Sequence, residues 1–126
     1  MAHCHFASNQ FAVGFWMRAN GVPANDQTIF AATQTADPFA PGVLVQLQDT
    51  GHIHYLYRPV MGGSGGTNLS STTVVADGEW HYITVVRERV DNFSTNNVTL
   101  YVDGVLEATA ADNTGLIDPT MVSIGR

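Results

Sequence analysis

The sequence contains no lysine, and its five cationic residues are all arginine. Eleven acidic residues oppose them and give a formal net charge of −6. Proteins that bind nucleic acid or anionic membranes need clustered positive charge, and here only Arg87 and Arg89 lie close together. No apolar run approaches the ~20 residues that cross a bilayer. We therefore expect the protein neither to bind nucleic acid nor to insert into a membrane.

The chain also has a single cysteine, Cys4, so no disulfide can form within it. The first residues lack the basic and apolar regions of a signal peptide, and residues 1–10 are expected to be disordered. A length of 126 residues suits one domain with a real core, so residues 1–126 are interpreted as a single domain.

Helical periodicity is nearly absent as well. No window carries apolar residues at the spacing of one helix face with caps at its ends. Short β-branched and aromatic runs instead alternate with clusters of Gly, Pro, Asn and Asp. In residues 11–18, one face of the predicted strand is apolar, with Phe11, Val13, Phe15 and Met17. This period of two predicts a strand that is buried on one face.

Further strands are predicted at 27–33, 42–48, 52–58, 72–76, 81–88, 98–102, 105–110 and 121–125. Asp103-Gly104 is a typical two-residue hairpin turn, and Asp49-Thr50-Gly51 forms a second short turn. The glycine-rich segment 60–68 lacks the lysine of a phosphate-binding loop and is interpreted as a flexible loop. Many short strands at a spacing of ~8–12 residues predict an all-β sandwich or barrel.

Several segments together resemble the laminin-G-like and concanavalin A-like lectin/glucanase superfamily, in particular its pentraxin-like bacterial modules. The matching features are Phe15-Trp16 with Arg18, Gly78 followed by Trp80-His81, Val85-Val86-Arg87, the segment from Leu100 to Gly104, and Ile124-Gly125. The resemblance covers residues 11–126 and implies a jelly-roll-like sandwich of two antiparallel sheets. It also implies a non-catalytic module that binds carbohydrate or a protein surface, in an extracellular or cell-envelope setting.

The resemblance has two departures. The family usually places one strand before the Phe-rich strand and another after the Ile-Gly pair, and neither has a counterpart here. Their absence would leave an unpaired strand edge or an uncovered apolar face. We expect a second copy of the chain to fill this gap, which makes the protein a homo-oligomer. A structural assembly domain without a small ligand is therefore the alternative to a recognition module.

The carboxylates do not have the spacing that glycoside hydrolysis requires. The active sites of glucanases in this superfamily resemble the sequence pattern Glu-x-Asp-x-(x)-Glu. This spacing puts an acid and a nucleophile on one face of a strand. Here Glu79 falls in a turn, Glu88 at a strand end, and Glu107 between apolar residues. No Gly-x-Ser-x-Gly elbow joins a strand to a helix either. We therefore expect no enzyme and no catalytic residue, with a glycoside hydrolase as the weakest alternative.

Two groups of residues are candidate metal ligands. His52 and His54 share a strand face and need a third ligand, such as His81, but a polar sheet face is the favoured interpretation. Calcium, which related domains often carry, is possible at Asp112, Asn113 and Asp118, although ordinary turn chemistry is favoured there too.

Exposed aromatic rings are the remaining candidates for a ligand site. Sugar-binding surfaces stack a ring face on Trp or Tyr and add polar groups for the hydroxyls. The candidate residues are Trp16, Tyr55, Tyr57, Arg58 and Tyr101. The alternative is that these rings fill the space between two sheets or contact another protein. Trp80 is expected to cover one end of the core. His81 is expected to begin a central strand, with its imidazole hydrogen-bonded to a loop.

Overall fold

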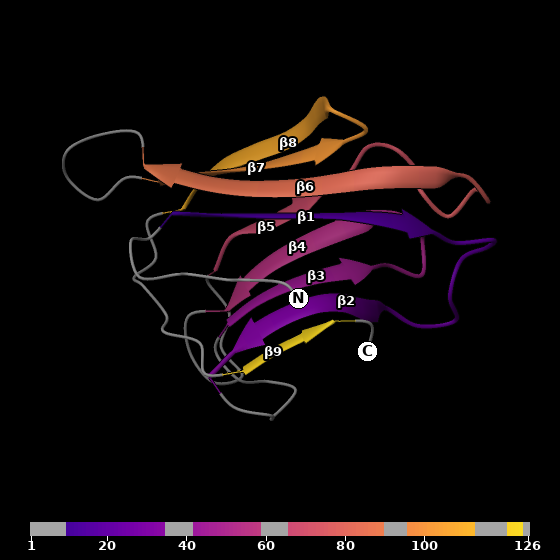
Figure 1. Ribbon diagram of the computed structural model, residues 1–126, viewed down its shortest axis with the longest axis horizontal. Coiled ribbons are helices and arrows are strands. Elements are labelled where there is room, and N and C mark those ends of the chain that lie inside the picture. Colours follow the sequence, from indigo (N-terminus) through magenta and orange to yellow (C-terminus); the bar gives the residue numbers. More distant parts are fainter. Residues whose placement is uncertain (1–9, 35–41, 59–65, 90–95, 113–120, 125–126) are drawn as a thin grey trace.

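The computed structural model describes residues 10–34, 42–58, 66–89, 96–112 and 121–124. These residues form two antiparallel sheets that face each other (Figure 1). The strands are β1 (Phe11–Arg18), β2 (Gln27–Thr33), β3 (Gly42–Leu47), β4 (Ile53–Arg58), β5 (Asn68–Ser70), β6 (Trp80–Arg89), β7 (Asn96–Val102), β8 (Val105–Asp112) and β9 (Met121–Ile124). The all-β, jelly-roll-like sandwich predicted from the sequence is confirmed.

The four-stranded sheet has the order β1-β6-β7-β8. Strands β7 and β8 form a hairpin at Asp103-Gly104, where φ is 53° and 80° respectively. Two successive residues with positive φ are what a type I′ turn requires. Strand β1 is far from β6 in the sequence but pairs with it along its whole length, from Phe11 opposite Arg87 to Arg18 opposite Trp80.

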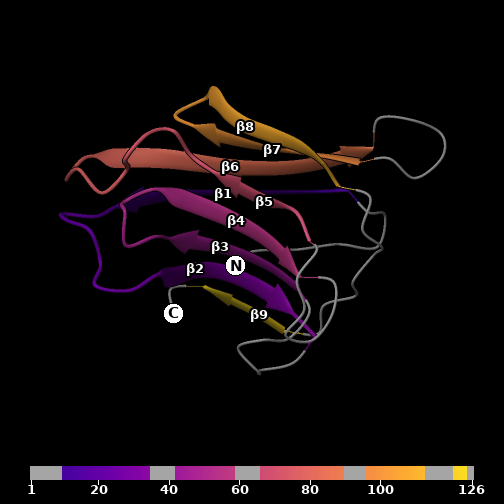
Figure 2. The ribbon, with the colours of Figure 1, turned by 180° about the vertical axis from the view of Figure 1, so that it is seen from behind.

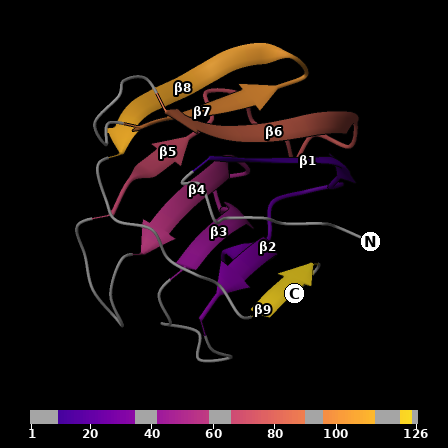
Figure 3. The same ribbon diagram turned by 60° about the vertical axis from the view of Figure 1, so that its left-hand side comes forward.

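The five-stranded sheet has the order β5-β4-β3-β2-β9. Its central pair, β3 and β4, is joined by the short turn predicted at Asp49-Thr50-Gly51, and Gly51 has a φ of 85°. Strand β2 carries an irregularity between Thr28 and Phe30. The two sheets approach each other most closely where β5 lies near β8 (Figure 3).

The core lies between the inner faces of the two sheets. The four-stranded sheet contributes Val13, Ile83, Val85, Val98, Leu100 and Val102, and the five-stranded sheet contributes Phe30, Val43, Val45, Ile53, Tyr55, Tyr57 and Leu69. Along β4 and β6 the buried residues alternate with the pleat, whereas β2, β3 and β7 also carry runs of consecutive buried residues. Each fully buried aliphatic side chain contributes about 1.5–3 kcal/mol to folding.

Strand β9 extends the inner face past the part that the other sheet covers. It lies at the margin of the five-stranded sheet, beyond β2 (Figures 1 and 2). Its Ile124 pairs with Phe30 and its Val122 with Ala32, both of which belong to the core cluster. Val122 and Ile124 are nevertheless 46% and 63% exposed. Among the described residues, the apolar inner face is therefore partly exposed at this margin.

One predicted strand is wrong. Residues 72–76 form no strand, and the strand that pairs with β4 is the shorter β5 just before them. The backbone N–H groups of Thr72 and Thr73 donate instead to the carboxylate of Glu107, and that of Val75 donates to the carbonyl of Gly51. The β-branched run bends at Thr72 and Thr73, and its hydrogen bonds go to two separate places, Glu107 and Gly51.

Of residues 1–10, where disorder is predicted, residues 1–9 lie outside the described part of the chain. Within the described part, no helix is long and apolar enough to cross a membrane.

Candidate functional site

The outer face of the four-stranded sheet carries a group of aromatic side chains from three neighbouring strands. We call Trp16, Trp80, Tyr82 and Tyr101 the aromatic row. Trp16 on β1 lies opposite Tyr82 on β6, and Tyr101 on β7 lies opposite Thr84, two residues further along β6. Trp16 is 65% exposed and Trp80 61% exposed. The sheet thus holds four rings on one surface, two of them largely open to solvent.

Trp16 and Tyr82 form a supported pair. Their ring centroids are 5.1 Å apart, and the ring planes are inclined by 57°. Gly14 makes room for the tyrosine, because a Cβ at this position would lie 2.4 Å from the Tyr82 hydroxyl oxygen and 3.1 Å from its ring carbon Cζ. The tyrosine ring therefore lies over β1 beside Trp16, and the two rings enclose an angle. They do not form a flat platform.

The outer face around the aromatic row has very little charge. Arg18 lies at one end of it and Glu88 toward the other. The side chains of this face between them are uncharged, namely Ala12, Trp16, Trp80, Tyr82, Thr84, Val86, Asn97, Thr99, Tyr101, Leu106, Thr109 and Ala111. The side chain of Arg18 is held in place because its Nε–H donates a hydrogen bond of 2.9 Å to the carbonyl of Gly78.

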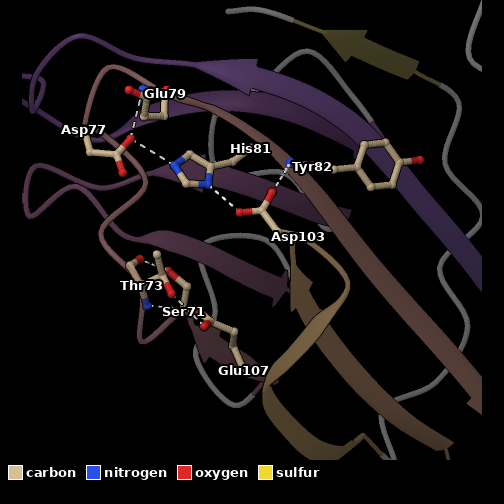
Figure 4. Close-up of polar contacts among 8 residues, drawn as sticks. All are labelled: Ser71, Thr73, Asp77, Glu79, His81, Tyr82, Asp103 and Glu107. Carbon is tan, nitrogen blue, oxygen red and sulfur yellow. Dashed lines mark hydrogen bonds and ion pairs between the residues drawn. The ribbon is translucent and has the colours of Figure 1, made fainter.

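A histidine bridges two aspartates at the same end of β6 (Figure 4). His81 Nδ1 is 2.7 Å from Asp103 Oδ2, and His81 Nε2 is 2.9 Å from Asp77 Oδ1. Both ring nitrogens face carboxylates, so both are N–H donors in the charged imidazolium form. We call His81, Asp77 and Asp103 the histidine clamp. It confirms the predicted hydrogen bond between this imidazole and a loop.

The clamp shifts the pKa of each of its members. The hydrogen bond to Asp103 raises the pKa of His81, burial opposes that change, and the bond to Asp77 adds to it. The pKa of Asp103 is lowered first by the backbone N–H of Tyr82 and then by His81. The pKa of Asp77 is lowered first by His81 and then by the backbone N–H of Glu79. Each contact favours the charged form of its acceptor or donor.

The clamp also holds the backbone that carries the aromatic row. Asp103 accepts a 2.9 Å hydrogen bond from the Tyr82 N–H through Oδ1, and its own N–H donates to the Tyr82 carbonyl at 2.8 Å. Asp103 belongs to the β7–β8 turn and Asp77 to the loop before β6, so the clamp ties both segments to the start of β6. His81 is thus a positioning residue for its neighbours Trp80 and Tyr82.

Glu107 anchors the bend at Thr72 and Thr73, which precedes the loop of Asp77 (Figure 4). Its carboxylate accepts from the N–H groups of Thr72 and Thr73 and, at 2.7 Å, from the Thr73 hydroxyl. Burial raises the pKa of Glu107, but the hydrogen bonds from Thr73 and Thr72 outweigh this effect and lower it overall. A carboxylate committed to three donors serves the fold and is poorly suited to proton transfer.

The outer face of the five-stranded sheet is chemically different. Thr28, Gln46, His54 and Asn68, which we call the polar row, are linked side chain to side chain across β2, β3, β4 and β5. The His54 ring lies 3.0 Å from Asn68 Oδ1 and 3.4 Å from Gln46 Oε1. This arrangement matches the predicted polar sheet face. Among the described residues, no group of three His, Cys, Asp or Glu side chains is placed to hold a metal ion.

Two of the five predicted ligand-binding residues lie inside the sandwich. Tyr55 and Tyr57 are 0% and 2% exposed, on the inner face of β4 with Ile53. These rings fill the space between the sheets and cannot contact a surface ligand, which corrects the prediction for both. Arg58 lies on the outer face of β4, on the opposite side of the molecule from Trp16 and Tyr101. The structure therefore groups only Trp16 and Tyr101.

The predicted calcium ligands do not form a site in the described residues. Asp112 is buried and lies 3.3 Å from the Nε atom of the equally buried Arg87. A carboxylate that neutralises a buried guanidinium does not suit calcium, which needs six to eight oxygen ligands and exposed carboxylates. This overturns the prediction for Asp112, while Asn113 and Asp118 lie outside the described residues.

Two features of the aromatic row differ from the sequence analysis. Trp80 does not cover an end of the core, because the alternation of β6 turns it outward while His81 faces inward. Tyr82 was not predicted as a site residue. The sequence does contain a signal for Tyr82. It lies two residues from Trp80, so both rings are expected on the same strand face, opposite the face of Ile83 and Val85.

Comparisons with known proteins agree with this architecture. A family model described as the Concanavalin A-like lectin/glucanases superfamily matches residues 2–126. The comparison with curated proteins finds no match. The similar solved structures share low identity and show the fold alone.

Three solved structures illustrate the likeness. The CBM40 of the Ruminococcus gnavus IT-sialidase bound to α2,3-sialyllactose has a TM-score of 0.63 and 14% identity, over 85% of this chain and 55% of that chain. The same CBM40 bound to α2,6-sialyllactose has a TM-score of 0.62 and 13% identity, over 92% and 63%. Domains LG4-5 of the mouse laminin α1 chain have a TM-score of 0.61 and 19% identity, over 91% and 26%. The chain therefore spans less than two thirds of each of these proteins.

Proposed function

The chain belongs to the Concanavalin A-like lectin/glucanases superfamily, and on that premise we propose that it is a non-catalytic recognition module that binds glycans. The binding surface in this proposal is the outer face of the four-stranded sheet. Trp16 is its central contact residue, with Tyr82 and Tyr101 beside it. Neither a metal ion nor another cofactor takes part.

The observation that carries the proposal is the Trp16–Tyr82 pair. A large apolar ring that is 65% exposed costs free energy in water unless a partner covers it. This ring is held in place, since Tyr82 packs against it and Gly14 accommodates the tyrosine. A supported ring loses little conformational entropy on binding, which is the property that a stacking contact needs.

The fold supports the same class of function. The sialidase CBM40 domains have been solved with sialyllactose bound, so a sandwich of this kind is compatible with glycan binding. Such modules usually act outside the cytoplasm, and we propose an extracellular or cell-envelope location for this one.

The carboxylates support a non-catalytic role. Glycosidases use two carboxyl groups that flank one bond, either about 5–5.5 Å or about 6.5–9.5 Å apart. Here Glu107 is bonded to Thr72 and Thr73, and Asp77 and Asp103 are bonded to His81. Each of these carboxylates already has a structural partner.

A glycan array followed by calorimetry, with and without calcium, tests the proposal. We expect saturable binding to at least one glycan, with the same affinity in both conditions. Trp16→Ala should abolish or strongly weaken it while the far-ultraviolet circular dichroism stays unchanged. No response to any glycan on the array would refute the glycan-binding function.

Assembly is a second candidate function, and the uncovered margin at β9 favours it. Val122 and Ile124 extend the apolar inner face and are exposed, and an edge strand with such a face can accept another strand. In this alternative a second copy of the chain covers the margin. Light scattering should then give the mass of an oligomer, and Ile124→Asp should return it to a monomer. A monomer at all concentrations would rule this candidate out.

A further inference from the structure

The charge distribution around the aromatic row indicates which glycans it accepts. Resting on the proposed glycan-binding function, we propose that the angle between Trp16 and Tyr82 binds a neutral pyranose sugar and discriminates against acidic sugars. The ligand class is thus an uncharged hexose or N-acetylhexosamine unit of a soluble chain. The inference would separate this module from the CBM40 domains solved with sialyllactose, a sugar that carries a carboxylate.

The geometry of the ring pair favours one sugar ring over a flat polymer surface. A pyranose presents an apolar C–H face, and an exposed indole offers the matching π-face. Trp16 is inclined by 57° to Tyr82, so the two rings cannot lie together on one plane of ligand. One sugar can stack on Trp16 while its edge meets Tyr82. A crystalline polysaccharide needs coplanar rings, and this pair does not provide them.

Hydroxyl side chains stand next to the rings on the same face. Thr84 lies opposite Tyr101, and Thr99 pairs with Thr109 through hydroxyl oxygens 3.2 Å apart. Hydroxyl groups donate and accept hydrogen bonds, so they match the hydroxyls of a neutral sugar. They provide no charge for a carboxylate or sulfate. An apolar protein partner would require a more continuous apolar patch than this alternation of rings and threonines.

The charged groups that surround the row are mainly negative. Asp77, Glu79 and Asp103 lie where β6 begins, and all three are exposed. They outnumber the two positive groups of this end, His81 in its charged form and Arg18. The whole chain also carries a formal charge of −6. An acidic sugar that stacks on Trp16 meets Arg18 on the same face of β1, but the acidic groups around this end outnumber the positive ones, so the net repulsion weakens its binding most at low ionic strength.

Matched glycans and matched variants test the inference on the complete chain. The probes are neutral lacto-series oligosaccharides, their sialylated counterparts and short polygalacturonate fragments, measured by calorimetry at low and at high salt. We expect neutral probes to bind and acidic counterparts to bind at least tenfold more weakly at low salt, with the ratio shrinking at high salt. Trp16→Ala should reduce affinity at least tenfold, which corresponds to about 1.4 kcal/mol.

Further variants locate the site. Trp80→Ala removes an equally exposed indole from the same face but outside the ring pair, and we expect a clearly smaller loss of affinity. Gly14→Ala displaces the Tyr82 ring without removing any ring, so it should weaken binding, and adding Tyr82→Phe should recover part of the loss. His54→Ala, on the opposite sheet face, should leave binding unchanged.

The possible outcomes distinguish the inference from the function on which it rests. Binding of acidic probes in preference to neutral ones would overturn the inference and leave the glycan-binding function standing. The inference would also be overturned, with the glycan-binding function still standing, if binding survived Trp16→Ala but disappeared in His54→Ala. Equal losses in Trp16→Ala and Trp80→Ala would overturn the role of the ring pair. The absence of binding to any probe would remove the proposed function itself.

Discussion

The two ends of β6 each place a basic side chain on the inner face of the sheet beside aspartate, but in different surroundings. At one end Arg87 and Asp112 are both buried, and the guanidinium carbon lies 5.1 Å from the centre of the Tyr57 ring. At the other end His81 contacts Asp77 and Asp103, which remain exposed. One strand thus holds a buried ion pair and a clamp at the rim of the sandwich.

The difference separates two physical roles. The Arg87–Asp112 pair lies in the core, and its contribution depends on how well the two buried charges compensate each other out of water. Histidine titrates near neutral pH, so the clamp responds to pH. The aromatic row lies at the titratable end, where Asp103 holds both His81 and the backbone of Tyr82.

Removing one member of the buried pair should have the largest effect on stability. Asp112→Ala leaves the buried Arg87 without this carboxylate, and we expect a loss of about 3–5 kcal/mol in the free energy of unfolding. Urea unfolding should show a lower midpoint with an unchanged slope. The double variant Arg87→Met/Asp112→Leu is the control and should recover most of the loss. A loss below about 1 kcal/mol in Asp112→Ala would contradict the buried ion pair.

The clamp should make the stability of the protein depend on pH. The pKa of His81 is raised above the ordinary value of 6.5, so its stabilisation is complete below pH 6.5 and is lost as pH rises through the folded-state pKa. The pKa values of Asp77 and Asp103 are lowered from 3.8, so their stabilisation holds above pH 3.8 and is lost as pH falls through the lower folded-state values.

Chemical denaturation between pH 4 and pH 9 measures this dependence. We expect the free energy of unfolding of the wild-type chain to decline above about pH 6.5. His81→Gln should remove that decline and lower stability at acidic pH. An identical alkaline decline in His81→Gln would show that another group causes it.

Tyr55→Phe should change the free energy of unfolding by less than the preceding variants, and it should stabilise the protein where they destabilise it. Its hydroxyl is buried and has no hydrogen-bond partner among the described residues. Burial, and after it the nearby Asp112, raises the pKa of Tyr55, so the ring stays neutral. Removing an unpaired buried hydroxyl should leave stability unchanged or raise it by up to about 1 kcal/mol. Tyr101→Phe is the half-exposed control, and a clear destabilisation by Tyr55→Phe would indicate a bonded hydroxyl.

Trp16→Ala should have the smallest effect on stability, although we expect it to have a large effect on binding. An exposed side chain outside the core usually changes the free energy of unfolding by no more than about 0.5 kcal/mol. Ile83→Ala, at a fully buried position on the next strand, should cost about 2–5 kcal/mol. A loss comparable to that of Ile83→Ala would mean that Trp16 belongs to the core.

Much of the fold was predictable from local pattern. The second strand begins and ends where the alternation placed it, at Gln27 and Thr33, and the Asp103-Gly104 turn has the expected positive φ values. The run at 72–76 was mistaken for a strand because β-branched residues favour extended backbone whether or not a partner strand is available. Its partners are Glu107 and Gly51, which no local pattern identifies.

The candidate site was predictable in part. The alternation of the first strand put Trp16 opposite its apolar face, and the same reasoning placed Tyr101. Tyr55 and Tyr57 failed as candidates because tyrosine suits both a core and a binding surface, and its chemistry alone does not choose between them. Asp112 failed because its partner, Arg87, lies on another strand and is far away in the sequence.

The sequence by itself determined most of the strands, the hairpin turns and the outward face of the first strand, since these follow from backbone sterics and a side-chain period of two. Only the tertiary structure decided which strands are neighbours. Pairing β1 with β6 put Trp16 beside Tyr82, and the position of the β7–β8 turn put Asp103 beside His81. Such contacts depend on how the whole chain closes its core, so residues distant in sequence meet only after the two sheets pack.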